Sequence, residues 1–333
     1  MNWSRVFITG ATGFVGGHLA RVLAAAGSKV HALKRPTSDD SDLRGIECVL
    51  FTGSLEDEAS LKRAIAGCDV VFHCAGVASF WAKYRDALYE VNVLGTRRLL
   101  AACLDSGIKC VVVTSSTAGL GIPASSTIGD EETAWNWQTY NIGYMETKFL
   151  QLQEIRRYTD LGLPVITVMP GLIVGEGDRT GCASRTGQLM KAMRESNIPG
   201  YAPGGITVVS IDDVVRGHVL AAERGRPGEQ YILGGAHLTF REIFDLLAEA
   251  VGVRIPAIPL TQEALLHLGA LYELRNATGE QEPVFTRELA VIMSQTCYYS
   301  DGKAQRELGY SASDPCKLIK LASDWYLANG YVR

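Results

Sequence analysis

The sequence contains no Cys-x-x-Cys pair and no cluster of cysteine and histidine residues. Its 8 cysteines and 6 histidines are scattered along 333 residues. Because structural zinc sites take their ligands from closely spaced cysteine and histidine side chains, we expect no metal site. Several cysteines, among them Cys74, Cys103 and Cys110, lie inside apolar strand or helix patterns. Such residues are typical of buried thiols in a reducing compartment, and we therefore expect a cytoplasmic protein.

Long apolar runs and runs of basic residues are also missing. No stretch of about 18 residues lacks charges and helix breakers, so we expect no transmembrane helix and no membrane partner. The formal net charge is −4 without a Lys/Arg cluster, which argues against nucleic acid as a partner. A strand-like run begins within a few residues of Met1, and we expect no signal peptide. The 47% hydrophobic and 20% charged residues are typical of a well-packed globular protein.

The first half of the chain alternates short β-branched runs with helix-like stretches. The strand candidates are nearly continuous apolar runs, as expected for parallel strands buried on both faces. They span residues 5–9, 29–34, 47–51, 70–74, 109–114 and 164–169. Helices are expected at residues 14–26, 57–66, 86–105 and 139–160. This alternation predicts an α/β protein with a doubly wound parallel sheet.

After residue 169 the alternation ends. Residues 171–205 are rich in glycine and predict a long loop or flap. Strand-like runs at 206–210 and 230–233 are expected to rejoin the sheet, and residues 239–333 are mostly helical. We therefore expect a domain of residues 1–170, to whose sheet residues 206–234 also contribute. Residues 171–333 are expected to form mainly a smaller, mostly helical lobe.

A glycine-rich turn follows the first strand directly. It reads Thr9-Gly10-Ala11-Thr12-Gly13-Phe14-Val15-Gly16 and leads into a helix. Glycine is required where the backbone approaches a pyrophosphate closely or takes a positive φ. The N-terminus of the helix offers free N–H groups and a positive dipole end to a phosphate. In the first βαβ unit this turn predicts a dinucleotide site, with a plain tight turn as the alternative.

The end of the second strand bears on which dinucleotide is bound. Folds that prefer NAD place Asp or Glu there to bind the ribose 2′-hydroxyl. This sequence has Lys34 and Arg35 and no acid. Because an arginine pairs well with phosphate, Arg35 favours NADP(H). An ordinary solvated pair of cations is the alternative.

The helix expected at 139–160 contains a candidate acid/base pair. Tyr144 and Lys148 are four residues apart and therefore project from the same face. The ammonium group stabilises a phenolate beside it, which suits the phenol for proton transfer. Ser116 follows the fifth strand, where side chains point into the ligand crevice of such sheets. Its hydroxyl is a candidate hydrogen-bond donor to a substrate oxygen.

Taken together, these motifs resemble the extended short-chain dehydrogenase/reductase family over nearly the whole chain. The matching segments are residues 9–16, 91–96, 112–116, 144–148, 209–214 and 301–310. The family's glycine motif, Thr-Gly-x-x-Gly-x-x-Gly, is the one found here. Within the family the sequence is most similar to dihydroflavonol 4-reductases and to 3β-hydroxysteroid dehydrogenase-like reductases. It is also similar to the bacterial hopanoid-associated sugar epimerase branch.

The resemblance implies a Rossmann-type fold and gives roles to individual residues. The catalytic residues are then Ser116, Tyr144 and Lys148. The residues around the cofactor are then Thr9, Gly10, Thr12, Gly13, Phe14, Val15, Gly16, Arg35, Ser54, Leu55, Ala75, Gly76, Tyr144, Lys148, Pro170 and Ile173. The chain departs from the family at Ser54, where an Asp usually binds the adenine amine. A serine there can still form a hydrogen bond.

The resemblance implies an NADP(H)-dependent enzyme that interconverts a carbonyl and a secondary alcohol on a small, non-nucleotide substrate. Two alternatives stay open, a sugar-nucleotide epimerase or dehydratase and a non-catalytic dinucleotide sensor. A sensor predicts a damaged triad, and the triad is intact. Sugar-nucleotide members usually carry an Asn after the sixth strand, where this chain has Gly171 and Leu172. The cations that could still bind a diphosphate are Arg179, Arg185, Lys191 and Arg194.

Four aromatic residues lie in loops near the expected crevice: Trp81, Tyr84, Trp135 and Trp137. They either line a pocket for a flat or apolar substrate or anchor these loops. The resemblance also suggests a homodimer formed through the helices at 86–105 and 139–160. The outer faces of these helices could equally be solvated.

Overall fold

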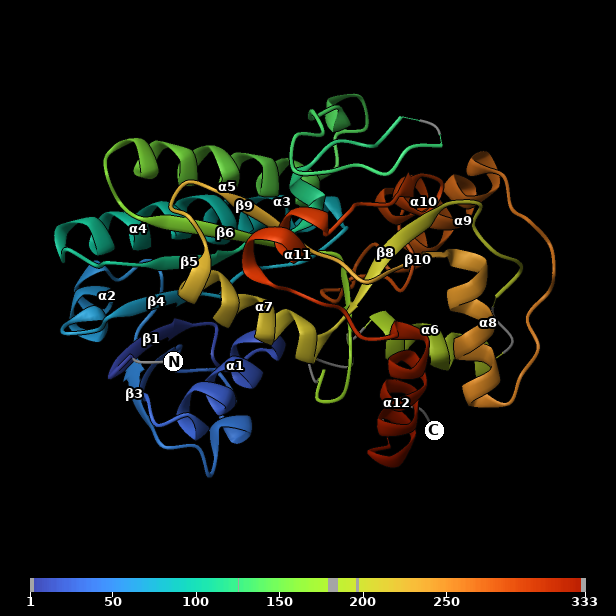
Figure 1. The fold of residues 1–333 in the computed structure, drawn as a ribbon. Coiled ribbons are helices and arrows are strands. Elements are labelled where there is room, and N and C mark those ends of the chain that lie inside the picture. The colour runs from blue at the N-terminus through green and yellow to red at the C-terminus, as the bar shows by residue number, and fades with distance from the viewer. Residues whose placement is uncertain (1–2, 125, 179–184, 196–197, 331–333) are drawn as a thin grey trace.

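The computed structural model describes residues 3–124, 126–178, 185–195 and 198–330, and only the backbone of residues 42, 185–188 and 315–318. Figure 1 shows an α/β domain on the left and a group of helices on the right. The left part is formed mainly by the first half of the chain. The right part is a lobe formed mainly by the second half.

The α/β domain is built on a seven-stranded sheet with the order β3-β2-β1-β4-β5-β6-β9. All its strand pairs are parallel. The strands are β1 (Arg5–Thr9), β2 (Lys29–Lys34), β3 (Cys48–Thr52), β4 (Val70–His73), β5 (Val111–Thr114), β6 (Val165–Pro170) and β9 (Gln230–Leu233). The strand order reverses between β1 and β4, which is where open α/β sheets bind ligands. The predicted doubly wound parallel sheet is confirmed.

Helices cover both faces of this sheet. Val6 and Ile8 of β1 join a core with α1 (Phe14–Ala25), α7 (Ile211–Arg224) and α11 (Gly302–Leu308). Phe7, which lies between them, joins a second core with α2 (Glu58–Ile65), α4 (Thr96–Asp105) and α5 (Gly143–Asp160). Successive residues of a strand point to opposite faces, so a buried parallel strand needs apolar residues at every position.

The single helix expected at 86–105 has three parts. A short helix α3 (Arg85–Leu88) passes into a π-helical turn (Tyr89–Gly95) and then into α4. Within this turn, the side-chain amide of Asn92 forms two hydrogen bonds with the backbone of Val77. Its oxygen accepts from the Val77 N–H, and its nitrogen donates to the Val77 carbonyl. A wider π turn re-aims one side chain without ending the helix, and such turns are frequent at functional sites. Here it holds the loop that follows β4.

The lobe contains a second sheet, which corrects one expectation. Its strands are β7 (Leu172–Val174), β8 (Gly205–Ser210), β10 (Ala236–Thr239) and β11 (Thr296–Cys297). Residues 206–210, expected in the main sheet, belong to β8 in this second sheet, and only β9 rejoins the main one. Val208 packs into the core of the lobe, whereas Val209 packs into the core of the α/β domain. A strand buried on both faces has the same apolar pattern in either sheet.

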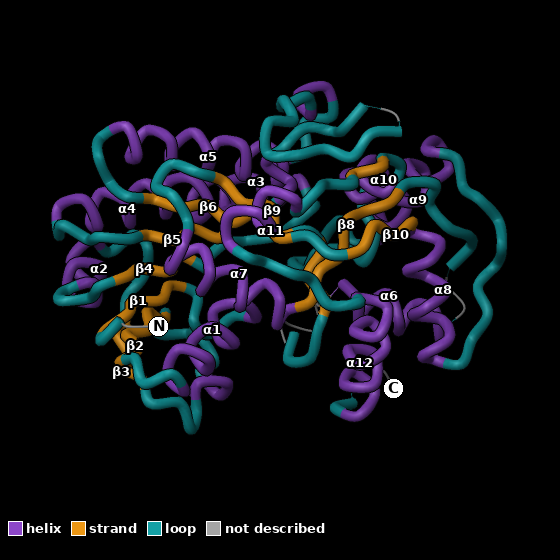
Figure 2. The backbone as a smooth tube through the Cα atoms, in the orientation of Figure 1, coloured by secondary structure: helices purple, strands orange, loops and turns teal. Residues whose placement is uncertain are grey.

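The rest of the lobe is mostly helical, as expected, and Figure 2 shows its helices around the short strands. They are α6 (Arg185–Arg194), α8 (Phe240–Val251), α9 (Gln262–Arg275), α10 (Arg287–Met293) and α12 (Pro315–Ala328). The region 171–205, expected as a long loop, therefore contains β7 and α6. Short 3-10 turns span Ser41–Leu43, Ala82–Tyr84, Thr117–Gly119 and Trp137–Thr139.

Candidate functional site

The glycine-rich turn connects β1 to α1 and leaves a space at the start of the helix. Gly10 has a φ of 71°, and a Cβ there would lie 2.6 Å from the backbone nitrogen of Ala75. A Cβ at Gly16 would lie 2.3 Å from the Gly10 carbonyl oxygen. At Gly13 the nearest atom would be that same oxygen at 3.3 Å, and no side chain caps the helix there. The first and third glycines are thus required by packing, and the second leaves room for a phosphate.

This turn opens into a cavity of about 400 Å³ at the carboxyl ends of the central strands. Twelve residues predicted at the site line it together: Gly10, Gly13, Phe14, Val15, Gly16, Ala75, Gly76, Ser116, Tyr144, Lys148, Pro170 and Ile173. The structure therefore gathers the glycine turn, the strand ends and the catalytic helix around one space.

The other predicted cofactor residues do not line this cavity. The hydroxyl of Thr9 is buried, accepts from the Ala75 backbone N–H and contacts His73 Nδ1 at 2.7 Å. Thr12 is only partly exposed. The Ser54 hydroxyl accepts from the Glu56 backbone N–H at 3.2 Å, and Leu55 packs against Gly95. Their side chains shape the loops of the site.

At the end of β2 the two cations have different surroundings. The ammonium of Lys34 forms an ion pair with Asp40. Arg35 is exposed, and its side chain has no hydrogen bond or ion pair within the part of the chain that the structure describes. Its guanidinium is therefore free to approach a ligand phosphate, whereas Lys34 already has an anionic partner.

Tyr144 and Lys148 lie on one face of α5, as their spacing predicts. The ammonium nitrogen of Lys148 is 6.0 Å from the centre of the Tyr144 ring. Lys148 is 5% exposed, and burial lowers its pKa to about 8. Its ammonium donates to the side-chain oxygen of Gln151 at 3.1 Å and to the Thr114 carbonyl at 3.5 Å. The hydroxyl of Ser116 accepts from the Ala118 backbone N–H at 3.1 Å, which leaves its proton free to donate.

A buried hydrogen-bonded chain leads from Lys148 to the glycine turn. The Gln151 amide nitrogen donates to Thr96 Oγ1 at 3.0 Å, and that oxygen contacts His73 Nε2 at 2.9 Å. Because the Thr96 proton goes to the Asn92 carbonyl, His73 must donate from Nε2 and accept from Thr9 at Nδ1. Burial lowers the pKa of His73 to about 3, so it is neutral.

Neither Gln151 nor His73 was predicted, because the contacts with Thr96 and Thr9 that place them in this chain join distant segments. Ser115 was missed as well. It lines the cavity beside Ser116, and its buried hydroxyl has no hydrogen-bond partner among the described residues. A buried, unpaired hydroxyl facing a cavity fits a polar ligand there. The Ser115-Ser116 pair was the only signal available in the sequence.

The aromatic residues near the crevice mostly anchor loops. Trp137 lines the cavity, but its indole N–H donates to the Leu120 carbonyl at 3.0 Å. Trp135 stacks on Phe149 with ring centres 4.6 Å apart. Trp81 is buried, and the Tyr84 hydroxyl donates to the Glu280 carbonyl at 2.6 Å. Of the two interpretations left open by the sequence, these contacts favour loop anchoring.

Phe80, which the sequence did not single out, packs against the reactive Tyr144. Its ring meets that of Tyr144 edge-on with centres 5.2 Å apart. Its backbone N–H donates to Glu282, and its carbonyl accepts from the Thr286 hydroxyl. Through Phe80, these contacts link the lobe residues Glu282 and Thr286 to Tyr144 on the catalytic helix.

A second cavity of about 210 Å³ lies between the lobe helices. Phe80, Leu172, Ile206 and Ile292 line both cavities, so the two are adjacent. Among the described residues, none that lines the second cavity is charged.

Within the described residues there is no group of His, Cys, Asp or Glu side chains placed to hold a metal ion. In the same part of the chain, no helix is long and apolar enough to cross a membrane. The described cysteines are free thiols, and burial raises the pKa of Cys74 and Cys68 to about 12. Cys182 and Arg179 lie outside the described residues.

Comparison with known proteins agrees with this geometry. Residues 6–234 match the NAD dependent epimerase/dehydratase family. The chain belongs to this family. As a member of this extended short-chain dehydrogenase/reductase family, it is an NAD(P)-dependent enzyme of the oxidoreductase and epimerase type. The uncapped start of α1, the open position at Gly13 and the unpaired Ser115 hydroxyl fit such a dinucleotide.

Relatives in the epimerase/dehydratase family match over nearly their full length. A Synechocystis protein with the provisional name dihydroflavonol 4-reductase is 30% identical, over 98% of this chain and 96% of its own. The 4-hydroxy-2-methyl-3-oxo-4-farnesyl-3,4-dihydroquinoline-1-oxide ketoreductase of Stigmatella aurantiaca is 33% identical, over 92% of each chain. The crystal structure of gox2253 superposes with a TM-score of 0.86 at 33% identity, over 99% of this chain and 100% of the other. The predicted family and fold are confirmed.

Proposed function

We propose that the protein is an NADP(H)-dependent oxidoreductase that interconverts a carbonyl and a secondary alcohol on a small, non-nucleotide substrate. The observation that carries the proposal is the apolar cavity next to the site. This cavity shares Phe80 with the Tyr144 cleft, and none of its described lining residues is charged. A sugar nucleotide brings a diphosphate, which needs cationic partners when it is bound.

Position 171 supports the same conclusion. A Cβ at Gly171 would lie 2.3 Å from the Thr207 carbonyl oxygen. The asparagine that sugar-nucleotide enzymes carry after this strand therefore has no room here. Lys191 is exposed and lies 4.0 Å from Glu195, and it does not line the apolar cavity. Arg194 does not line that cavity either. Arg179 and the side chain of Arg185 lie outside the described part of the structure.

The chain's own groups suit the proton part of the reaction. When bound, the nicotinamide supplies or accepts the hydride. Tyr144 donates its proton to the carbonyl oxygen during reduction and takes it back during oxidation. The ammonium of Lys148 stabilises the phenolate that remains. Ser116, whose oxygen is already bound to the Ala118 N–H, donates to the same substrate oxygen.

Preference for NADP(H) rests on Arg35. Its exposed guanidinium can pair with the 2′-phosphate, and the neighbouring Lys34 is held by Asp40. We further propose that residues 1–170 together with β9 hold the cofactor, and that residues 171–333 mainly hold the substrate. A cytoplasmic location and a homodimer formed through α4 and α5 stay predictions.

The test compares two kinds of turnover. The protein is incubated with NADPH and, separately, aryl ketones, ketosteroids and β-keto acyl compounds, and NADPH oxidation is followed. In parallel, UDP- and GDP-sugars are incubated with the protein and analysed for epimers. Stoichiometric NADPH loss with alcohol formation supports the proposal. Epimer formation without net NADPH loss, together with no reduction of any carbonyl, refutes it.

A further inference from the structure

The second cavity is unusual in the composition of its walls. Of the described side chains that line it, Tyr272 alone carries a hydroxyl, amide or charged group, and the others are apolar or glycine. Helices α6, α8, α9 and α10 all contribute to it. A space of this kind offers water few hydrogen bonds and offers hydrocarbon many dispersion contacts.

The cavity borders the site that contains the reactive groups. Phe80 lines both cavities, and its ring packs edge-on against the Tyr144 ring with the ring centres 5.2 Å apart. Leu172 and Ile292 line both cavities as well. A group bonded to a carbonyl carbon that lies at the Tyr144 hydroxyl is therefore next to the apolar wall that the two cavities share.

One residue that lines the cavity, Val284, lies at the surface and is 41% exposed. A substrate arm longer than the cavity could therefore continue into solvent. This feature distinguishes the cavity from a closed pocket, which would set a sharp upper limit on substrate length.

From this geometry we propose that the cavity binds an extended hydrocarbon arm of the carbonyl substrate. The substrate class is then a ketone or aldehyde carrying an alkyl or prenyl-like chain. This inference rests on the proposed reductase function for the position of the carbonyl. The binding of the arm itself depends only on the cavity.

Binding is tested with a neutral fluorescent probe, N-phenyl-1-naphthylamine, and with a series of unbranched methyl ketones from 2-butanone to 2-dodecanone. The ketones displace the probe from the NADPH-loaded protein, and the inhibition constant is measured for each. We expect affinity to rise about fourfold for each added methylene while the chain lies in the cavity. NADPH oxidation is recorded with the same ketones.

Two matched variants locate the binding. Leu268 of α9 lines the cavity, whereas Leu271 on the same helix is 51% exposed and does not line it. Leu268→Gln should weaken 2-dodecanone binding about tenfold, because a polar group enters the apolar wall. Leu271→Gln should match the wild type. Circular dichroism confirms that both variants are folded.

The outcomes separate the two proposals. Affinity independent of chain length, absence of saturable probe binding, or equal effects of the two variants would overturn the hydrocarbon site. Chain-length-dependent binding that Leu268→Gln weakens supports it, whether or not the ketones turn over. Failure of every carbonyl to be reduced counts against the reductase function alone.

Discussion

At the scale of single residues, the charge of Lys148 depends on a balance between burial and hydrogen bonding. Burial lowers its pKa to about 8, while the oxygen of Gln151 accepts from its ammonium at 3.1 Å. A hydrogen bond to the charged form favours that form. Gln151 is itself fixed by Thr96, which His73 and Asn92 hold in place. We infer that this chain positions Lys148 and keeps it charged at neutral pH.

Replacing Gln151 should therefore move the pH dependence of the enzyme. In Gln151→Met the acceptor is lost and volume is kept, so the pKa of Lys148 should fall below about 8. The alkaline limb of kcat/KM for NADPH, which reports groups of the free enzyme, should shift down by about one pH unit. An unchanged profile with a merely lower rate would show that Gln151 has only a structural role.

Tyr144→Phe tests the proton transfer directly. The variant should fold and bind NADPH as the wild type does, because Lys148 and the glycine turn are untouched. Its kcat should fall about 10²–10⁴-fold, the usual contribution of a general acid/base group. Near-normal kcat on a substrate that the wild type reduces would make the assignment wrong.

Arg35→Ala tests the choice of dinucleotide. The wild type should bind NADPH more tightly than NADH, and the variant should lose that preference. A charge-assisted contact with the 2′-phosphate is worth about 1.5–3 kcal/mol. Isothermal titration with both cofactors measures this. Equal dissociation constants in the wild type would contradict the proposal.

The residues predicted from the sequence are those whose evidence is local. The Tyr144–Lys148 spacing and the glycine turn are short patterns, and the structure places them around one cavity. His73 contacts Thr9 from 64 positions away, and Phe80 is held by residues more than 200 positions away. Contacts between such distant segments arise only when the sheet and lobe assemble, so neither residue carried a signal in the sequence.

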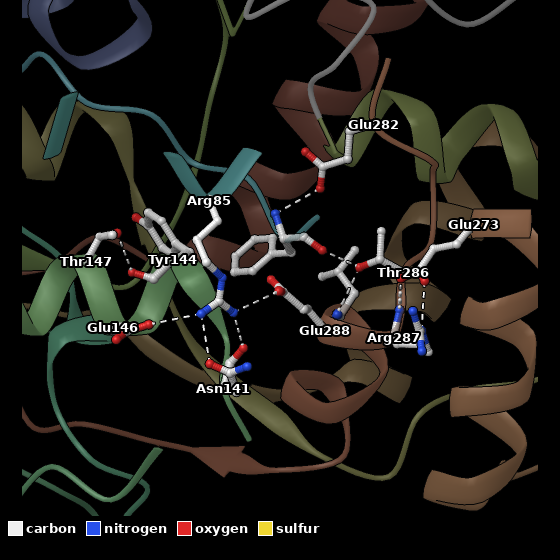
Figure 3. Close-up of polar contacts among 12 residues, drawn as sticks. Arg85, Asn141, Tyr144, Glu146, Thr147, Glu273, Glu282, Thr286, Arg287 and Glu288 are labelled. Carbon is white, nitrogen blue, oxygen red and sulfur yellow. Dashed lines mark hydrogen bonds and ion pairs between the residues drawn. The ribbon is translucent and has the colours of Figure 1, made fainter. Parts of the chain in front are cut away.

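At the scale of elements, α10 and α5 meet through a buried carboxyl. Oε1 of Glu288 on α10 lies 4.0 Å from a guanidinium nitrogen of Arg85. The Glu288 carboxyl also accepts a hydrogen bond from the backbone N–H of Gly143 at the start of α5. Figure 3 shows Arg85 between Glu288 and the α5 residue Glu146. Burial nevertheless raises the pKa of Glu288 to about 7, and its Oε2 has no hydrogen-bond partner within the described chain. The folded protein therefore favours the protonated carboxyl, because the cost of burying its charge outweighs the attraction of Arg85 and the Gly143 N–H.

This raised pKa makes stability depend on pH. The folded state holds the proton between about pH 4.5 and pH 7, where the unfolded chain has lost it. Stability from this group is thus present below pH 4.5 and is lost as the pH rises through 7, by roughly 2 kcal/mol after allowance for screening. Glu288→Gln should match the wild type near pH 4.5 and exceed it by that amount at pH 8 in urea unfolding. A pH-independent difference would contradict this.

The elements themselves were predictable where burial and periodicity agree. The strands of the main sheet lie within two residues of their expected positions. The π turn at Tyr89–Gly95 was not predicted, because its side chains keep a helix-like pattern. The prediction that β8 belongs to the main sheet was wrong. Alternate residues of this strand are buried in two different cores, so its apolar pattern does not tell the two sheets apart. Hydrophobic periodicity shows that a strand is buried and leaves its neighbours undetermined.

At the scale of the whole molecule, β8 joins the two parts of the protein. Val208 belongs to the core of the lobe and Val209 to the core of the α/β domain. The chain then runs through α7 back into the main sheet at β9. Because neighbouring residues of one strand support both cores, loss of either core removes packing from the other. We therefore expect the described parts to unfold together.

Two adjacent substitutions test this coupling. Val208→Ala and Val209→Ala each remove buried methyl groups and should destabilise the protein by about 2 kcal/mol. Calorimetry should show one transition for the wild type, and both variants should lower its midpoint by a similar amount. Val49→Ala is the matched control, since Val49 is 51% exposed and its replacement should change the midpoint little. Two separate transitions, with Val208→Ala moving only one and Val209→Ala only the other, would show that the lobe and the α/β domain unfold independently.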